Sequence, residues 1–376
     1  MKRFYHHLLF EEYRLSYGAL ALYRIVFAVA YIGLLGVPSF TWLSQVPPYF
    51  YEPQAFNLAR WLVPTLPGFM VLLLLDIAVL VSLVGILFGF QTKLMSWGLT
   101  LSLLVGYTIQ YSLGKIDHTI ILVVLPAVMS FSGWGKCFSL DARRNPQPAL
   151  DSPDGYVPFL MALILGFGIF TAAVPKIFGG WLLSDQSGVV NQFYARYYAF
   201  GGPALLAPLF SETPSWAWKA GDYSAVLFEF LFFPAVLNKR VFQWFCALAI
   251  LFHIANLLVL NIIFTSNLLV YLLFIRWSPV LYLLRKYALL HRLSGWFTYR
   301  NLLIVLGLML GQYYGCVYAF NTFMGEDSST LALLTRPFDW QLLHWEGIVL
   351  VTVALVILVW QVMYRPRFSK YHVSPK

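Results

Sequence analysis

The sequence predicts an all-α membrane protein, a polytopic bundle of nine or ten transmembrane helices with long aromatic-rich outer loops. Its 376 residues are 60% hydrophobic and 11% charged, whereas soluble domains have roughly 45–50% apolar and about 25% charged residues. The mean hydropathy is +0.72. Uncharged runs of about 20 residues, long enough to cross a bilayer as a helix, recur along the chain. The alternating apolar and polar residues of an outer-membrane barrel do not occur in this sequence.

The candidate spans are about 18–37, 68–90, 94–113, 117–133, 157–175, 222–237, 241–260, 262–278, 301–320 and 346–364. The stretch 241–275 has no charged residue. As one helix it would be roughly 50 Å long, which exceeds a hydrocarbon core of about 30 Å. We therefore expect two helices that fold back near Asn261. The domain organisation expected is a transmembrane domain over 1–300, followed over 301–376 by two additional C-terminal transmembrane helices and a short basic tail.

The net charge of +9 reflects membrane topology and not nucleic-acid binding, because Lys and Arg occur in short clusters between apolar runs. With the N-terminus in the cytoplasm, 18 of these residues fall inside, and Arg24 lies within the first span. Six fall outside, namely Arg60, Lys115, Lys176, Arg196, Lys219 and Arg336. We therefore expect an integral protein of the bacterial inner membrane, monomeric or weakly oligomeric, with both termini in the cytoplasm.

The three cysteines, Cys137, Cys246 and Cys316, are widely spaced and include no C-x-x-C pair. This spacing predicts neither a disulfide framework nor a metal site. The expected outer segments are rich in Pro, Gly and aromatic residues, among them Tyr197 and Trp216. They suit either an aromatic belt at the interface or short elements that cover a pocket and stack on a ligand.

The segment TAAVPKIFGGW, residues 171–181, ends a long apolar run at Pro175 and places Lys176 directly after it. Apolar surroundings disfavour the charged form of a lysine, so that Lys176 is a candidate base. The alternative is a lysine at a helix end that extends to the membrane surface.

Other polar residues are expected at the same depth, on the outer side. They are Asp76 in the second span, Asp117 and His118 at the start of the fourth, and His253 and Asn256 in the seventh. Because ionisable groups inside a membrane are costly, we expect these residues and Lys176 to line one cavity. The alternatives are a core histidine for His253 and a helix–helix hydrogen bond for Asp76. Arg24 and Glu229 lie deeper, where an ion pair that locks two helices is expected.

Four segments resemble successive blocks of the vitamin K-dependent γ-carboxylase superfamily, also called the horizontally transferred transmembrane domain family. The segments are ALYRIVFAVAYIGLL, KIDHTIILVVLPAVMSFSGWGKCFSLD, FGIFTAAVPKIFGGWLL and LFHIANLLVLNIIFTSNLLVYLLF. The resemblance covers roughly 17–276. Its specific features are Lys176 five residues before Trp181, His118 at the outer start of a span, and Phe-His-x-x-Asn at 252–256.

The resemblance implies a chemistry in which a lysine deprotonates a reduced quinone (vitamin K hydroquinone or menaquinol). Reaction with oxygen then gives a strong base that takes a proton from a peptide glutamate, which captures carbon dioxide. Lys176 matches the base, His118 the histidine that supports it, and His253 a further histidine of the active site.

The sequence departs from the family at two places. The family has a lysine doublet where this chain has Pro175–Lys176, and the family has an asparagine where this chain has Asp117. We also expect no large lumenal domain of the kind that binds a propeptide in the family, so that recognition of a tagged protein is not implied. Two functions are weighed: a membrane enzyme that uses a reduced quinone and oxygen at its outer face to carboxylate or otherwise modify a peptide, and a non-catalytic subunit or maturation factor that binds quinone, lipid or peptide. A secondary transporter ranks third, because broken inverted repeats are not found in the sequence.

Overall fold

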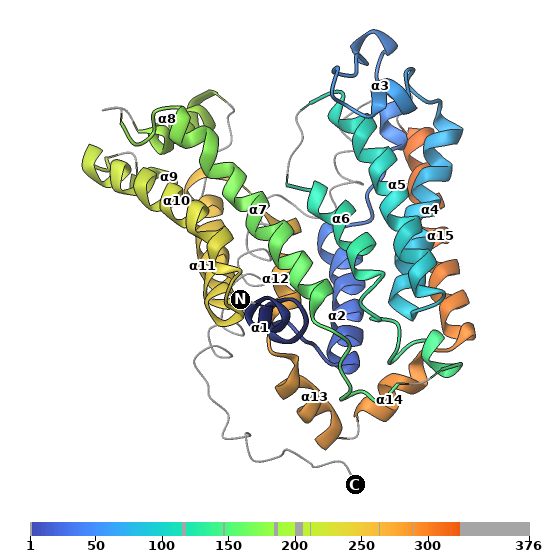
Figure 1. Ribbon diagram of the computed structural model, residues 1–376. Helices are drawn as coiled ribbons and strands as arrows, with labels where there is room; N and C mark the ends of the chain where they lie inside the picture. Colours follow the sequence, from blue (N-terminus) through green and yellow to red (C-terminus); the bar gives the residue numbers. More distant parts are fainter. Residues whose placement is uncertain are drawn as a thin grey trace. The chain divides into compact units, whose positions relative to one another are not determined.

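The computed structural model describes residues 2–114, 118–145, 147–183, 187–199, 206–210, 212–262, 264–287 and 289–323. These residues form helices, turns and loops, and no β-strand occurs among them. The chain divides into two compact units (Figure 1). The first contains residues up to 161, 265–273 and the described residues from 277 onwards, and the second contains 162–264 and 274–276.

The first unit contains a bundle in which α4 packs against α2, α5 and α15, and α5 packs against α6 (Figure 1). Its elements are α1 (Lys2–His6), η1 (His7–Glu12), α2 (Tyr17–Ala30), η2 (Tyr31–Leu35), η3 (Thr41–Gln45), η4 (Pro48–Phe50), α3 (Ala59–Leu62), α4 (Phe69–Phe88), α5 (Thr92–Tyr111), α6 (Ile120–Met129), η5 (Asp141–Arg143), α12 (Thr265–Tyr271), α13 (Trp277–Lys286), α14 (Leu289–Trp296) and α15 (Tyr299–Phe323).

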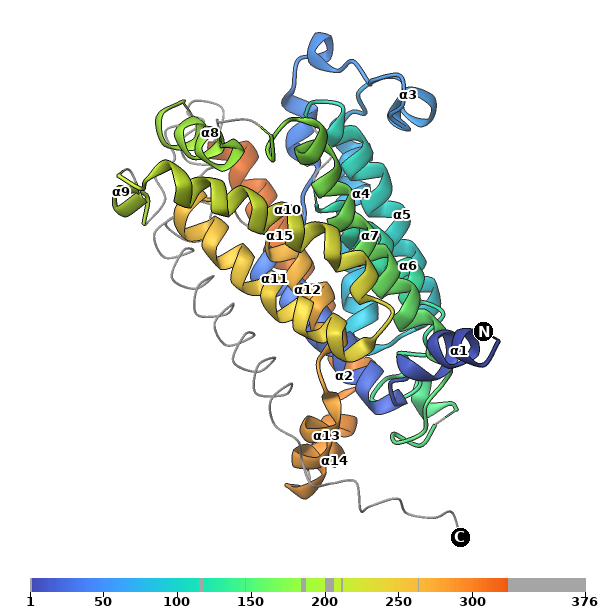
Figure 2. The same ribbon diagram turned by 60° about the vertical axis from the view of Figure 1, so that its left-hand side comes forward.

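The second unit is built on α10 and α11, which pack against each other and against the short helix α8 (Figure 2). Its elements are α8 (Gly188–Tyr194), η6 (Ala195–Ala199), α9 (Ala207–Phe210), α10 (Ser215–Ala235) and α11 (Lys239–Leu260). The helix α7 (Tyr156–Phe178) begins in the first unit and continues into the second, and η7 (Leu272–Phe274) also crosses the division.

Three helices of the described chain, α4, α7 and α11, are long and apolar enough to cross a membrane. The number rises to five if two bent pairs, 3–12 with 17–33 and 266–274 with 277–286, each count as one span. These helices are compatible with an integral membrane protein. The predicted final span and most of the predicted domain 301–376 lie outside the described residues.

The break near Asn261 agrees with the sequence prediction, since α11 ends at Leu260 and Asn261 adopts a left-handed conformation with φ of 52°. Asparagine accepts this conformation at a helix C-terminus more readily than most residues.

Two predicted spans are wrong in extent. The predicted span 117–133 contains the ten-residue helix α6, Ile120–Met129. The predicted span 262–278 ends at Phe274, where the chain bends by 74° into α13. The bend has a local cause. Pro279 lies in the first turn of α13, where proline is tolerated, but proline disfavours a helical turn directly before it.

Arg24 of α2 is buried in the first unit and connects α2 to two other segments. It is fully inaccessible and donates hydrogen bonds to backbone carbonyls of Ile86 and Leu87 at the end of α4, and of Trp134 and Phe138 in the loop after α6. The expected ion pair between helices is therefore replaced here by carbonyl contacts. Carbonyls at a helix C-terminus lack intrahelical donors and carry partial negative charge, which makes them suitable partners for a guanidinium.

Candidate functional site

The end of α7 positions Lys176 beside Trp181. The Trp181 amide donates to the Lys176 carbonyl at 3.1 Å and the Gly180 amide to the Ile177 carbonyl at 3.3 Å, while Gly180 has φ of +77°. This pair of bonds is a Schellman motif, in which a glycine in the left-handed conformation ends a helix and reverses the chain. The reversal brings the Trp181 ring centroid to 5.4 Å from Lys176 Nζ, a cation–π contact.

Lys176 forms an ion pair with Glu229 of α10, in which Nζ donates to Oε1. The Lys176 side chain is 21% exposed and that of Glu229 is 6% exposed. The second carboxylate oxygen, Glu229 Oε2, is buried and has no hydrogen-bond partner in the described part of the chain. A buried carboxylate oxygen without a donor is costly, so that this atom is the natural place for a donor from a ligand.

The helix α10 also holds the turn that follows Lys176. Lys219 donates to the Trp181 carbonyl, and the Tyr223 hydroxyl donates to the Leu182 carbonyl at 2.9 Å. Asp222 is fully buried and lies 3.6 Å from Lys219 Nζ. Lys219, Asp222 and Glu229 lie on α10. Together with Lys176 of α7 they form a group of two cations and two carboxylates whose formal charges cancel.

Asp222 fixes α8 over the same turn. Its carboxylate accepts the amide protons of Gly188 at 3.2 Å and of Val189 at 2.9 Å, which satisfies two free donors of the first turn of α8. A Cβ atom on Gly188 would lie 2.0 Å from the Trp181 ring. Glycine at this position is thus required for the close packing of α8 on Trp181, which confines the ring beside Lys176.

His253 and Asn256 lie on α11, in the same unit. The His253 ring is half-buried and stacks on Phe264, with a centroid distance of 4.4 Å and an interplanar angle of 22°. The Asn256 carbonyl accepts the Ile262 amide at 3.2 Å as part of the C-terminal cap of α11. The ion-pair partner of Lys176 is Glu229.

The aromatic residues proposed from the sequence differ in burial. Tyr197 stacks on Phe193 with a centroid distance of 5.9 Å and belongs to a cluster around the buried Trp218. Trp216, in contrast, is 73% exposed in the first turn of α10. The ring that lies against Lys176 is that of Trp181.

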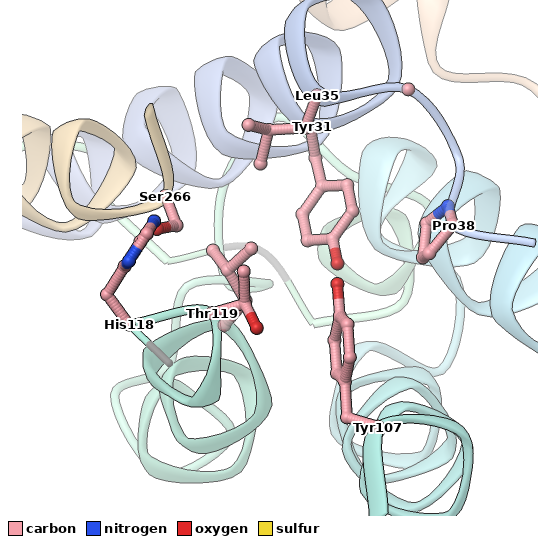
Figure 3. A pocket seen from close by; sticks show the side chains of 9 residues that line it. Tyr31, Leu35, Pro38, Tyr107, His118, Thr119 and Ser266 are labelled. Atoms are coloured by element: carbon pink, nitrogen blue, oxygen red, sulfur yellow. The ribbon is translucent and has the colours of Figure 1, made fainter. Parts of the chain in front are cut away.

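His118 belongs to the first unit, where it lines a cavity of about 150 Å³. Figure 3 shows the Tyr31 and Tyr107 hydroxyls pointing toward each other across this cavity, with Thr119 beside them and Ser266 next to His118. Tyr31 is placed by η2, a single turn of π-helix, and such turns occur frequently at functional sites.

Asp76 is not among the residues that line that cavity. It is 1% exposed and accepts hydrogen bonds from the Ser39 hydroxyl at 2.7 Å, the Phe40 amide at 2.7 Å, the Thr41 amide at 3.3 Å and the Tyr313 hydroxyl at 2.5 Å. Four donors satisfy its charge, and Asp76 thereby caps η3 and joins it to α4 and α15.

The structure thus brings Lys176 and Trp181 together and adds Glu229 as the partner of the lysine. The same unit also contains His253, Asn256, Tyr197 and Trp216. Asp76 and His118 belong to the other unit, and Asp117 lies outside the described residues, so that a cavity common to these polar residues stays a prediction. The first unit and the second contain no group of three His, Cys, Asp or Glu side chains arranged for a metal ion among their described residues.

The sequence predicts an ion pair between helices at Glu229, and the structure has this pair with Lys176 as the partner. Sequence reasoning missed that Glu229, Asp222 and Lys219 belong to one site with Lys176. A signal for them was present, because these three residues recur at a spacing of three and seven residues within an otherwise apolar helix. This spacing places them on one face of α10.

Comparison of the chain with protein-family models, with curated proteins and with solved structures gives no match.

Proposed function

We propose that this protein is an integral membrane enzyme that binds a reduced quinone beside Trp181 and removes a phenolic proton from it at the Lys176–Glu229 pair. The observation that supports the proposal is the ion pair itself, which lies where the apolar helix α7 ends and carries one carboxylate oxygen without a partner among the described residues. A quinol is apolar and partitions into lipid, so that its head group reaches such a position from the bilayer.

Each residue of the pair has a distinct part in this proposal. Glu229 Oε2 accepts the hydrogen bond and then the proton of a phenolic hydroxyl. Lys176, as an ammonium group, stabilises the negative charge left on the phenolic oxygen, and Trp181 covers the site from one side. This division of roles differs from the one that the family resemblance implies, in which the lysine is itself the base.

The later steps of the proposal depend on the resemblance. Reaction of the deprotonated quinol with oxygen, and carboxylation or another modification of a peptide, are carried over from the carboxylase superfamily. Vitamin K hydroquinone and menaquinol are both suitable, since either presents an apolar ring with a phenolic hydroxyl. His253, which lies in the same unit, is proposed as a hydrogen-bonding residue of the reaction.

A binding subunit without turnover is the second candidate function. It is favoured by the same ion pair, because a lysine and a glutamate of opposite charge that join α7 to α10 also serve as a structural lock. In that case a quinone, lipid or peptide binds beside Trp181 without losing a proton.

The test is turnover of chemically reduced menaquinol or vitamin K hydroquinone by the purified full-length protein in the presence of oxygen, with the quinone products separated by chromatography. We expect Glu229→Gln to lower turnover at least a hundredfold, because the amide cannot accept the proton. Lys176→Arg keeps the positive charge and should retain measurable turnover.

The opposite pattern, with Lys176→Arg inactive and Glu229→Gln active, would assign the proton to the lysine, as the resemblance implies. Glu212→Gln is a matched control, because Glu212 is an exposed carboxylate of the same unit. If the wild type and both variants bind quinol but none turns it over, the enzyme proposal fails and the binding subunit replaces it.

A further inference from the structure

The connection between η7 and α15 has an unusual combination of position, charge and exposed aromatic residues. It contains α13 and α14 and spans Arg276 to Arg300. The preceding helical segment, 266–274, and α13 meet at an angle of 74°, so that α13 runs nearly perpendicular to the apolar segment before it.

This connection packs on one end of the first unit. Leu281 of α13 is buried and lies against Gly18 in the first turn of α2, where a Cβ atom would be 3.1 Å from the leucine. Trp296 of α14 stacks on Phe88, the last residue of α4, with a centroid distance of 4.7 Å. Figures 1 and 2 both place α13 and α14 at the same end of this unit. Because α2 begins and α4 ends there, the connection lies across the ends of the bundle helices.

The outward side of the connection is cationic. Arg285, Lys286, Arg292 and Arg300 are all exposed, and the sequence contains no acidic residue from 230 to 325. Neighbouring elements add further positive charge, since Arg144 donates to the Tyr299 hydroxyl at 3.3 Å. Among the acidic side chains of the neighbouring loop, Asp141 is engaged by Thr92, Asp154 pairs with Arg14, and Asp151 is exposed.

Exposed apolar and aromatic side chains alternate with these cations. Tyr282, Leu283, Tyr287, Trp296 and Tyr299 are each more than 40% exposed. Helices that lie in a membrane interface combine such aromatic side chains with Lys and Arg on one surface. Their cations attract anionic headgroups, at about 1 kcal/mol for each Lys or Arg near the surface.

We propose that the segment Arg276–Arg300 lies in the membrane interface and binds the phosphate headgroups of anionic phospholipids through Arg285, Lys286, Arg292 and Arg300. The aromatic side chains enter the headgroup region and keep α13 and α14 parallel to the bilayer. This site is independent of the proposed quinol chemistry, because none of its residues belongs to the Lys176–Glu229 site.

The test uses the full-length protein in bilayers of phosphatidylcholine that contain a small fraction of spin-labelled phosphatidylglycerol or, in a second arm, spin-labelled phosphatidylcholine. The ratio of the two lipid association constants is measured for the wild type, for each single variant Arg285→Gln, Lys286→Gln and Arg292→Gln, and for the triple variant. We expect the wild type to prefer phosphatidylglycerol. Each single variant should reduce the preference about fivefold or less, and the triple variant at least twofold more than any single one.

Arg60→Gln is the matched control, because Arg60 is an exposed cation of the same unit on a different segment, α3, and its loss should leave the ratio unchanged. Unfolding temperatures in pure phosphatidylcholine identify any variant that has lost its fold. Addition of 10 mM inorganic phosphate should not change the ratio if the bilayer is the ligand, whereas a site for free phosphate would lose its lipid preference. A wild type without preference for phosphatidylglycerol, or a folded triple variant that keeps the full preference, would overturn the proposal.

Discussion

Lys176 and Trp181, which are five residues apart, meet because the Schellman motif joins the residue three positions before a helix cap to the second residue after the cap. A contact between these two positions commonly accompanies the motif, and here it is the cation–π contact with Trp181. The spacing that resembles the carboxylase superfamily therefore has a local physical cause. The same geometry fixes the lysine for an ion pair with Glu229.

Replacement of Gly180 by alanine tests this dependence at a single residue. Gly180 has φ of +77°, a conformation that costs an alanine about 1–2 kcal/mol. We expect Gly180→Ala to lower the free energy of unfolding by about 1 kcal/mol and to reduce quinol turnover by displacing Trp181. Gly168→Ala is the control, since Gly168 lies inside α7 with open space around it, and alanine there should stabilise the helix. Equal effects of the two substitutions on stability and turnover would contradict the role of the turn.

Cys137 gives a prediction about pH. Its thiol donates to the Gln147 carbonyl, and burial, with a contribution from Asp151, raises the pKa of Cys137 from 9.0 to about 11 although Arg24 opposes the shift. The unfolded chain ionises this thiol at lower pH than the folded chain. The stability contributed by the neutral thiol is therefore complete below about pH 9 and is lost as the pH rises to about 11.

We expect the difference in free energy of unfolding between wild type and Cys137→Ala to shrink between pH 8 and pH 11. Denaturation in a mild detergent at a series of pH values measures it. A difference that stays constant across this range would show that the Cys137 thiol titrates as it does in the unfolded chain.

At the scale of elements, η3 is held in place by a single side chain. The Asp76 carboxylate accepts the amide protons of Phe40 and Thr41, and hydrogen bonds to a charged group contribute about 1.5–3 kcal/mol each. We expect Asp76→Ala to increase hydrogen exchange at these two amides at least tenfold. Tyr313→Phe removes one other donor and leaves both amide bonds in place, so that its effect on exchange should be much smaller. Similar protection in wild type and Asp76→Ala would refute the capping role.

The long helices could be predicted from the sequence, and the short elements could not. The runs that become α4, α7 and α11 are apolar over about 20 residues and end at Gly89, Gly179 and Asn261, residues that favour helix ends. The elements η3, α8 and α9 contain too few residues to show a period. The bend between η7 and α13 depends on Pro279, a proline effect that an apolar run conceals.

Only the local part of the candidate site could be predicted from the sequence. Lys176 and Trp181 are close in sequence, and their proximity follows from local helix-capping geometry. The pairing of Lys176 with Glu229 joins residues 53 positions apart, so that it depends on how α7 packs against α10. Hydrophobic patterns do not specify such a pairing, because the aromatic residues around Glu229 permit several rotations of the helix.

For the whole molecule, the distribution of Lys and Arg predicts cytoplasmic termini and places residue 290 on the cytoplasmic side. We expect a cysteine introduced as Leu290→Cys, with Cys137, Cys246 and Cys316 replaced by serine, to react with an impermeant maleimide in inside-out vesicles. Phe56→Cys is the control, because Phe56 is 77% exposed in a segment predicted to lie outside, and it should react in intact cells. Labelling of position 290 in intact cells would refute this topology.

The contacts of Arg24 have a consequence for biosynthesis. In a membrane-inserted chain this guanidinium cannot reach all its carbonyl partners until α4 and the loop after α6 have been made, since Trp134 follows it by 110 residues. At roughly 5–20 residues per second, that interval is on the order of 5–20 s. During this time a helix with an uncompensated charge is poorly tolerated by lipid. The first helix must therefore remain beside the insertion machinery or at the headgroup level. It can pack into the bundle once the chain after α6 supplies the remaining carbonyl partners of Arg24.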